Sequence, residues 1–190
     1  MQKQEELLER HQSRSQPDKD GLTEYDYLLA EALEDPGLFS DVFLKHELWG
    51  RQLDILDSIS KNTETAVKAC HSSGKTFTAA DAALWWLARW PDGVVVTTAP
   101  SDLQVRQLLW GEIAATVETS VYPFPAPNQT SLKISAKRYA IGFSTNVTQQ
   151  NQGVKFQGFH SGHILIIIDE APGVHPGIYE AIKGIMANEN

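Results

Sequence analysis

Two runs of apolar and β-branched residues stand out in the hydrophobic pattern of this chain. Val94–Thr98 reads VVVTT and Ile164–Ile168 reads ILIII, and neither run contains a charged residue. A run without polar alternation predicts a strand buried on both faces, as in a parallel sheet that helices cover on both sides. The shorter run Thr65–Val67 is expected to add another strand. The pattern therefore predicts an α/β fold with a mostly parallel sheet.

Segments with helical periodicity separate these runs. The helix predicted over residues 77–90 carries small residues, as a helix packed closely on a sheet requires, and Pro91 and Gly93 end it. A hairpin is expected around residues 136–138, after a loop at 122–128 in which three prolines remove backbone donors. Further helices are predicted over residues 2–14, from Thr23 to Leu33, over 38–44, 53–60 and 103–119, and from about 177 to 186.

Composition restricts the class of protein. The chain has 190 residues, of which 42% are hydrophobic and 21% charged, which is typical of one globular domain. No segment approaches the roughly 18 apolar residues of a membrane span, and the polar start lacks a signal-peptide core. Cys70 is the single cysteine, so no internal disulfide can form and a reducing cytoplasm fits best. We therefore expect a cytoplasmic protein that has no membrane partner.

The net charge of −8 is unevenly distributed. Residues 1–45, expected to form a small N-terminal helical extension, carry 11 Asp and Glu against 5 Lys and Arg. Residues 46–190, expected to form the main domain, carry 13 against 11 and are close to neutral. Because nucleic acid binding needs clustered Lys and Arg, any contact with DNA must be local or lie outside this chain.

The segment from Ala69 to Thr76, ACHSSGKT, follows the pattern G-x-x-x-x-G-K-[ST] of a phosphate-binding P-loop except at Ala69. Backbone N–H groups of such a loop and the positive end of the following helix favour an anion. Lys75 can reach the β- and γ-phosphates, and Thr76 can ligate Mg²⁺. The alternative is a Ser-Gly turn before an amphipathic helix with a solvated lysine. The candidate nucleotide-binding residues of the loop are Ala69, Cys70, His71, Ser72, Ser73, Gly74, Lys75 and Thr76.

Two carboxylates follow the second apolar run directly. Asp169 and Glu170 come after Ile168, at the end of a predicted buried strand. In open α/β folds, ligands bind at the carboxyl ends of the strands. Asp169 is therefore expected to hold Mg²⁺ through water, and Glu170 to polarise the attacking water. Together with the P-loop, this Walker B pattern predicts ATP binding with Mg²⁺.

Two further positions each leave two interpretations open. Gln52 precedes Lys75 by some two dozen residues, where many translocating ATPases place an amide that reads adenine; the alternative is a surface glutamine at a helix start. The turn at residues 99–102 either contacts DNA or couples subunits, as in helicase-like motors, or is a plain connection between strand and helix.

In combination, these motifs resemble the ATPase domain of the large terminase subunit of tailed bacteriophages. The resemblance covers residues 46–190. It implies a P-loop NTPase fold of the RecA-like (ASCE) type and a motor that hydrolyses ATP to move double-stranded viral DNA into a procapsid. By this resemblance, Gln52 contacts adenine, and Lys75 and Thr76 bind phosphate and Mg²⁺. Asp169 binds the metal, and Glu170 activates the attacking water. The segments that carry it are Arg51-Gln52, the P-loop, Thr98-Ala99-Pro100 with Gln104, Gln157-Gly158-Phe159-His160 and Asp169-Glu170-Ala171-Pro172-Gly173-Val174.

The same resemblance implies partners: a homo-oligomeric ring, a portal protein and a small terminase subunit, in the cytoplasm of the bacterial host. One alternative is a helicase-like DNA-dependent ATPase, although Pro172 follows Ala171 where DEAD or DEAH is usual. Another is a nucleotide-binding module without turnover.

The chain also departs from the terminase pattern. It stops at Asn190, before the strand of the third motif, and it lacks the nuclease domain. We therefore expect a partial ATPase domain, such as a truncated prophage copy or an expressed piece, with an incomplete C-terminal end. Expressed alone, it is expected to aggregate, or to pair its flanking strands directly, and to hydrolyse ATP negligibly. Arg106 and Arg138 are the candidates for an arginine that acts on a neighbouring subunit.

Overall fold

The computed structural model describes residues 17–70, 72–145 and 158–186, and within them the chain forms a four-stranded mixed sheet. Its strands are β1 (Gly93–Ala99), β2 (Ser131–Lys133), β3 (Tyr139–Ser144) and β4 (His163–Ile168), in the order β2-β3-β1-β4. β1 runs parallel to both β3 and β4, and only β2 is antiparallel. The predicted α/β class is confirmed, and the arrangement is compatible with a Rossmann-like α/β fold.

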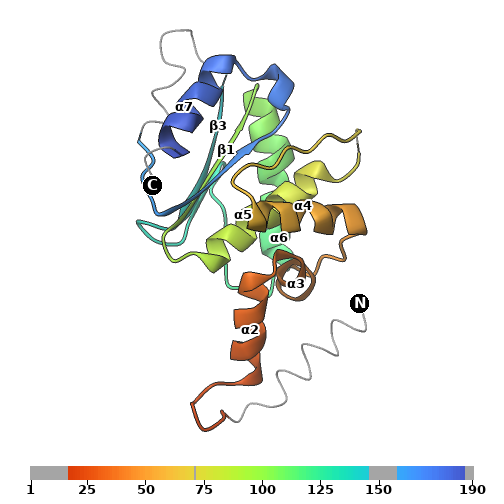
Figure 1. Ribbon diagram of the computed structural model, residues 1–190, viewed down its shortest axis with the longest axis vertical. Coiled ribbons are helices and arrows are strands. Elements are labelled where there is room, and N and C mark those ends of the chain that lie inside the picture. Colours follow the sequence, from red (N-terminus) through yellow and green to blue (C-terminus); the bar gives the residue numbers. More distant parts are fainter. Residues whose placement is uncertain (1–16, 71, 146–157, 187–190) are drawn as a thin grey trace.

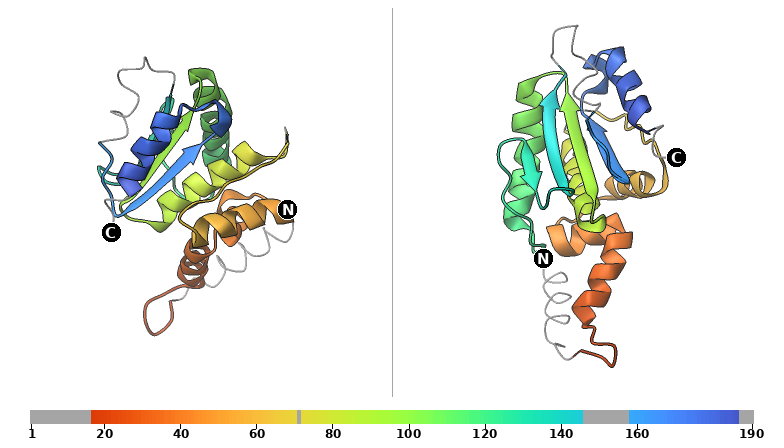
Figure 2. Two further views of the ribbon diagram at one scale, coloured as in Figure 1. Left: turned by 45° about the horizontal axis from the view of Figure 1, so that its top comes forward. Right: turned by 90° about the vertical axis from the view of Figure 1, so that its left-hand side faces the viewer.

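Helices cover both faces of the sheet (Figures 1 and 2). One face carries α5 (Lys75–Arg89), the π-helical segment η2 (Gln104–Leu109) and α6 (Trp110–Thr119); the other carries α7 (Pro176–Met186). Side chains alternate along β1 because successive strand residues point to opposite faces. Val95 and Ala99 belong to the core with α5 and α6, whereas Val94 and Val96 belong to the core with α7. The sheet is therefore the middle of three layers.

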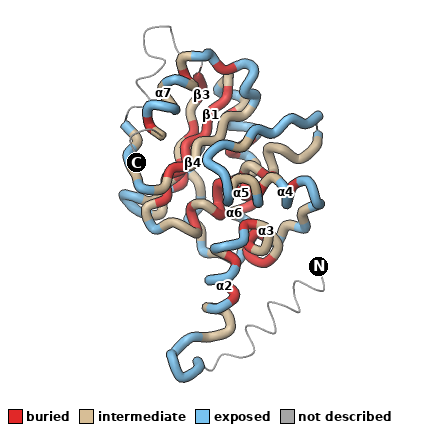
Figure 3. Tube along the Cα trace, viewed as in Figure 1, coloured by how far each residue is buried: buried red, intermediate tan, exposed pale blue. Residues whose placement is uncertain are grey.

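β1 is the centre of the sheet, and all seven of its residues are buried (Figure 3). β4 was expected to be equally buried, but only Ile164 is, and its other residues are partly exposed. Both faces of β4 contact core residues. Its exposure arises because, within the described part of the chain, β4 pairs with β1 alone. The expectation of full burial was wrong for β4 and right for β1.

The strand expected at Thr65–Val67 does not form. Residues 62–70 have no helix or strand, and Val67 is 41% exposed. A strand requires a neighbour for its backbone N–H and C=O groups, and none of the four described strands pairs with this segment. The P-loop is therefore preceded by irregular chain, which corrects the predicted strand–loop–helix unit.

The other predicted elements within the described residues are present. The hairpin is β2 and β3, and α5, β1, β4 and α7 lie where they were expected. The helix expected over 103–119 begins with the π-helical η2, in which Val105 and Leu109 are buried, and continues as α6. The helix expected over 2–14 lies outside the described residues. The remaining elements are α2 (Glu24–Glu34), α3 (Pro36–Phe39), π-helical η1 (Ser40–Leu44), α4 (Gly50–Lys61) and the 3₁₀ turn η3 (Ala171–Gly173).

The N-terminal helices pack on α5. A capping box between Thr23 and Asp26 starts α2, the helix that the sequence predicts from Thr23. Trp85 of α5 donates from Nε1 to the carbonyl oxygen of Leu33 at 3.0 Å, which fixes the end of α2. The start of α2 projects from the body (Figure 1). No helix within the described ranges is long and apolar enough to cross a membrane.

Candidate nucleotide-binding site

A pocket of about 430 Å³ lies at the edge of the sheet where β4 ends. This volume is within the usual range for sites that bind small molecules. The two motifs found in the sequence line one wall each, although Lys75 and Asp169 are far apart along the chain. A third wall comes from η2 and α6. The lining residues are Ser72, Ser73, Gly74, Lys75, Thr76, Phe77, Gln107, Leu108, Glu112, Asp169 and Glu170.

The P-loop has the backbone of a compact turn that leads into α5. Ser72 and Gly74 have positive φ values of 58° and 78°, and Gly74 is the N-cap of α5. Positive φ is unusual for serine, and such conformations gather at functional sites. Ala69, the departure from the P-loop pattern, is not among the described residues with positive φ, so alanine is accommodated there without backbone strain. His71 lies outside the described residues.

Lys75 folds back over its own loop. Its Nζ donates to the carbonyl oxygen of Cys70 at 2.8 Å and to that of Ala69 at 3.2 Å. Ser73 Oγ donates to the same Cys70 carbonyl at 2.9 Å. As the first residue of α5, Lys75 adds a full positive charge to the positive end of a 15-residue helix. The loop and the lysine thus form an anion-attracting wall.

The carboxylates of the opposite wall extend from β4. The N–H of Asp169 donates to the carbonyl oxygen of Thr98 at 2.9 Å, which continues the pairing with β1 by one residue. Glu170 has φ of 49°, a left-handed conformation that turns the chain sharply, and its N–H donates to Asp169 Oδ1 at 3.0 Å. A Cβ at Gly173 would lie 2.7 Å from Pro100, so the turn packs tightly against the end of β1.

Asp169 has the electrostatics of a partly dehydrated carboxylate. Burial raises its pKa above the usual value, and the negative charge of Glu170 raises it further. The hydrogen bond from the Glu170 N–H and the positive charge of Lys75 act in the opposite direction. A carboxylate that loses hydration and faces a second carboxylate is well suited to a cation.

Two side-chain oxygens of the pocket are of the kind that Mg²⁺ takes from a protein. Among the described residues, no group of three or more His, Cys, Asp and Glu could hold a metal ion. Mg²⁺ usually binds through one or two protein oxygens, several waters and substrate phosphates. Thr76 and Asp169 both line the pocket and supply one hydroxyl and one carboxylate.

Gln52 lies against the P-loop but does not line the pocket. It is only 6% exposed, and its Oε1 accepts a hydrogen bond from the Trp49 N–H at 3.2 Å. Its Nε2 lies 2.7 Å from the point that a Cβ on Gly74 would occupy. The structure thus brings Gln52 to the loop that holds Lys75, while the adenine contact stays a prediction.

The sequence did not single out the third wall. Gln107, Leu108 and Glu112 reach the pocket from η2 and α6 because these elements pack beside α5. Their only signal in the sequence is their place on the first turns of the helix that follows β1. Glu112 is therefore a third carboxylate at the site that motif reasoning missed.

The two arginines proposed for a neighbouring subunit have contacts within this chain. Arg138 donates to the carbonyl oxygens of Leu87 and Ala88 at the end of α5, and to the Tyr122 hydroxyl at 3.1 Å. These bonds satisfy carbonyl groups at the C-terminal end of a helix. Arg106 lies 3.5 Å from Gln129 Oε1 and is exposed. Arg138 thus has a structural task, and the intersubunit role stays a prediction for both.

Comparison of the chain with models of protein families, with curated proteins and with solved structures finds no match.

Proposed function

We propose that this chain binds Mg·ATP in the pocket between the P-loop and the end of β4, and that the site hydrolyses the nucleotide. The observation that carries the proposal is the meeting of Lys75, Thr76, Asp169 and Glu170 in one pocket. A solvated lysine after a Ser-Gly turn would have no reason to face a carboxylate pair. This geometry favours the P-loop interpretation over that alternative.

Each residue has a definite task in the proposed reaction. The loop N–H groups and the start of α5 bind the phosphates, and Lys75 exchanges its carbonyl partners for phosphate oxygens. Thr76 and Asp169 hold Mg²⁺, which neutralises charge on the phosphates when bound. Glu170 orients the attacking water and takes its proton. Phosphoryl transfer depends mainly on such positioning and charge stabilisation.

The resemblance to the large terminase subunit supports a finer proposal. In this interpretation the domain is RecA-like, and hydrolysis drives the translocation of double-stranded viral DNA into a procapsid. Copies of the complete protein then form a homo-oligomeric ring. Its partners are the portal protein and the small terminase subunit in the cytoplasm of the bacterial host. This proposal rests on the motif combination and on the α/β sheet that carries it.

The competing function is a nucleotide-binding module without turnover. Glu170 is exposed. A binding module requires the same contacts between the P-loop and the nucleotide, but Glu170 has no task in it because no water attacks the phosphate. The two functions therefore differ at a single side chain.

Glu170→Gln separates them, because glutamine keeps the shape of the side chain but cannot accept the proton. We expect this variant to bind Mg·ATP as the wild type does, while hydrolysis falls by about 100-fold or more. Because the 190-residue chain alone is expected to hydrolyse ATP negligibly, turnover is measured in a longer protein that completes the ATPase domain, where double-stranded DNA is expected to stimulate the wild-type rate. The control is Glu118→Gln, which removes an exposed carboxylate from α6. In that longer protein, equal turnover in wild type and Glu170→Gln would place the base elsewhere, and nucleotide binding without any turnover would favour the module.

A further inference from the structure

We propose that Gln52 is a positioning residue for the phosphate loop, acting through Gly74 rather than through the base of the nucleotide. This inference rests on the proposed function, because it assigns to Gln52 a task at the same site. The task differs from the adenine contact that the resemblance implies.

The first observation is the close contact between the Gln52 amide and Gly74. A Cβ at position 74 would lie 2.7 Å from Nε2 and 3.7 Å from Cδ of Gln52, so the amide occupies the space beside the glycine. Gly74 has φ of 78°, a conformation that side chains rarely adopt. An amide held against this residue resists any change in the turn that aims the loop N–H groups.

The second observation is that the Gln52 amide is itself held in place. Its Oε1 accepts the Trp49 N–H at the start of α4, and the side chain is 6% exposed. One of the two lone pairs of the oxygen that would accept from the adenine amino group is thus already used within the protein. Because Gln52 touches Gly74 without lining the pocket, it supports the loop from outside the pocket.

The third observation is that the segment before α4 is fixed to the first turns of α5. His46 packs against Phe77, with 4.3 Å between ring centroids, and its Nδ1 lies 2.8 Å from Oδ1 of the buried Asp81. Phe77 also lines the pocket. These contacts hold the segment before α4 against α5, the helix whose N-terminus would receive the phosphates, and α4 itself also packs on α5.

Positioning and base reading predict different ligand dependence. A positioning residue supports the loop for any phosphate chain, so its loss weakens ATP, GTP and tripolyphosphate equally. A base-reading residue affects only the preference for ATP over GTP. A merely structural residue lowers the melting temperature without changing the affinity of the folded protein for tripolyphosphate.

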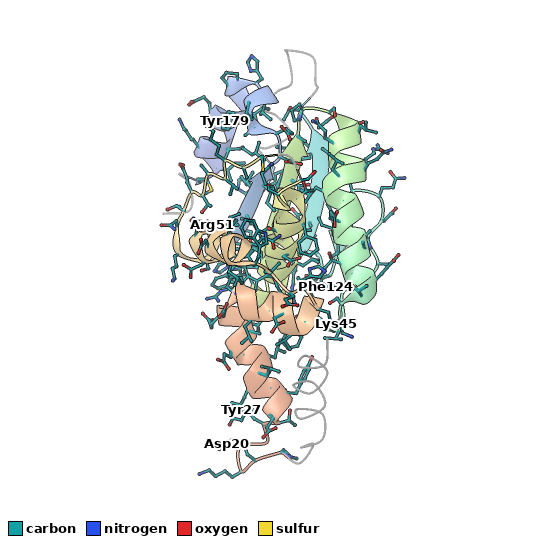
Figure 4. All side chains as sticks on the ribbon, turned by 90° about the vertical axis from the view of Figure 1, so that its right-hand side faces the viewer. Asp20, Tyr27, Lys45, Arg51, Phe124 and Tyr179 are labelled. Carbon is teal, nitrogen blue, oxygen red and sulfur yellow. The ribbon has the colours of Figure 1, made fainter. Side chains whose placement is uncertain are left out.

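The experiment measures binding of ATP, GTP and tripolyphosphate, each with Mg²⁺, to the 190-residue chain by calorimetry. We expect Gln52→Ala to weaken all three by a similar factor of about ten, the effect of losing one well-placed contact. Gln52→Met, which refills the space beside Gly74 but cannot pair with adenine, is expected to restore most of the affinity. The control is Arg51→Ala on the same helix, where the side chain is exposed and its ion pair among the described residues is with Asp54 (Figure 4).

Loss of the preference for ATP over GTP in either Gln52 variant, with tripolyphosphate binding unchanged, would overturn the inference and leave the proposed function intact. Absence of binding of all three ligands to the wild type would instead refute the proposed function and with it this inference. If Gln52→Ala does not fold, Gln52→Met decides alone. In that case a similar residual weakening of ATP, GTP and tripolyphosphate binding by Gln52→Met supports positioning. A lost preference for ATP over GTP, or unchanged affinity for all three ligands, overturns it.

Discussion

Trp110 Nε1 donates a hydrogen bond to Thr97 Oγ1 at 2.9 Å, directly over the backbone of Gly142. This bond joins α6 to the central strand β1, and both side chains are buried. A Cβ at Gly142 would lie 2.1 Å from Trp110 Nε1 and 2.7 Å from Thr97 Oγ1. Position 142 therefore has no room for a side chain, and α6 lies close to the sheet only because this residue is glycine.

Gly142→Ala is expected to lower the free energy of unfolding by about 2–3 kcal/mol, because the methyl group must displace a buried hydrogen-bonded pair. Urea unfolding measures the change. The control is Gly111→Ala on α6, where an added Cβ meets nothing within 4 Å. Since alanine favours a helix more than glycine does, the free energy of unfolding of this variant should rise by about 0.5–1 kcal/mol. Unchanged stability in Gly142→Ala would show that α6 packs differently.

Asp169→Asn is expected to stabilise the protein in metal-free buffer at neutral pH. Burial raises the pKa of Asp169 in the folded state, so its charged form opposes folding at any pH above that raised value. The asparagine variant should therefore melt at a higher temperature at pH 7. This advantage should vanish below about pH 3.8, where the carboxyl group is protonated in both states.

The expected gain for Asp169→Asn is modest, because the side chain is partly exposed and the Glu170 N–H bond favours the charge. Thermal unfolding at several pH values measures it. Glu118→Gln, which removes an exposed carboxylate, serves as the control and should show no comparable gain. A lower melting temperature for Asp169→Asn at pH 7 would contradict the assigned environment.

His46→Ala is expected to lower the free energy of unfolding by about 2–4 kcal/mol, because it removes a partner of a fully buried carboxylate. Asp81 is 0% exposed, and its Oδ2 has no hydrogen-bond partner among the described residues. A double-mutant cycle with Asp81→Asn tests the pairing through urea unfolding. The loss of unfolding free energy from His46→Ala should be smaller in the Asp81→Asn background than in the wild type. Equal losses in both backgrounds would mean that the pair contributes no coupling.

The strongest patterns of the sequence were reliable guides to the fold. The apolar runs that became β1 and β4 leave little choice but a sheet, and Pro91 and Gly93 mark the end of α5. The order of strands was less predictable, because pairing depends on tertiary contacts. Nothing local in the hairpin indicates that β3 pairs parallel with β1. The run Thr65–Val67 has the composition of a strand but no described partner strand.

The candidate site was predictable where a motif fixes the backbone. Gly74 and Lys75 follow from the loop pattern, and Asp169 follows from its place after an apolar run. Glu112 could not be predicted, because it reaches the pocket only through the packing of α6 beside α5. The burial of Gln52 was equally hidden, since a glutamine at a helix start is usually exposed.

The central claim is that Lys75 and the carboxylates of β4 enclose a site for Mg·ATP, and binding to Lys75→Ala tests it most directly. Calorimetry should show that the 190-residue chain binds Mg·ATP and that Lys75→Ala weakens binding by about tenfold or more, because a charge-assisted contact is lost. The control is Lys137→Ala, whose exposed lysine lies in the β2–β3 turn at the opposite edge of the sheet and should leave the affinity unchanged. Equal affinity for Mg·ATP in wild type and Lys75→Ala would contradict the account.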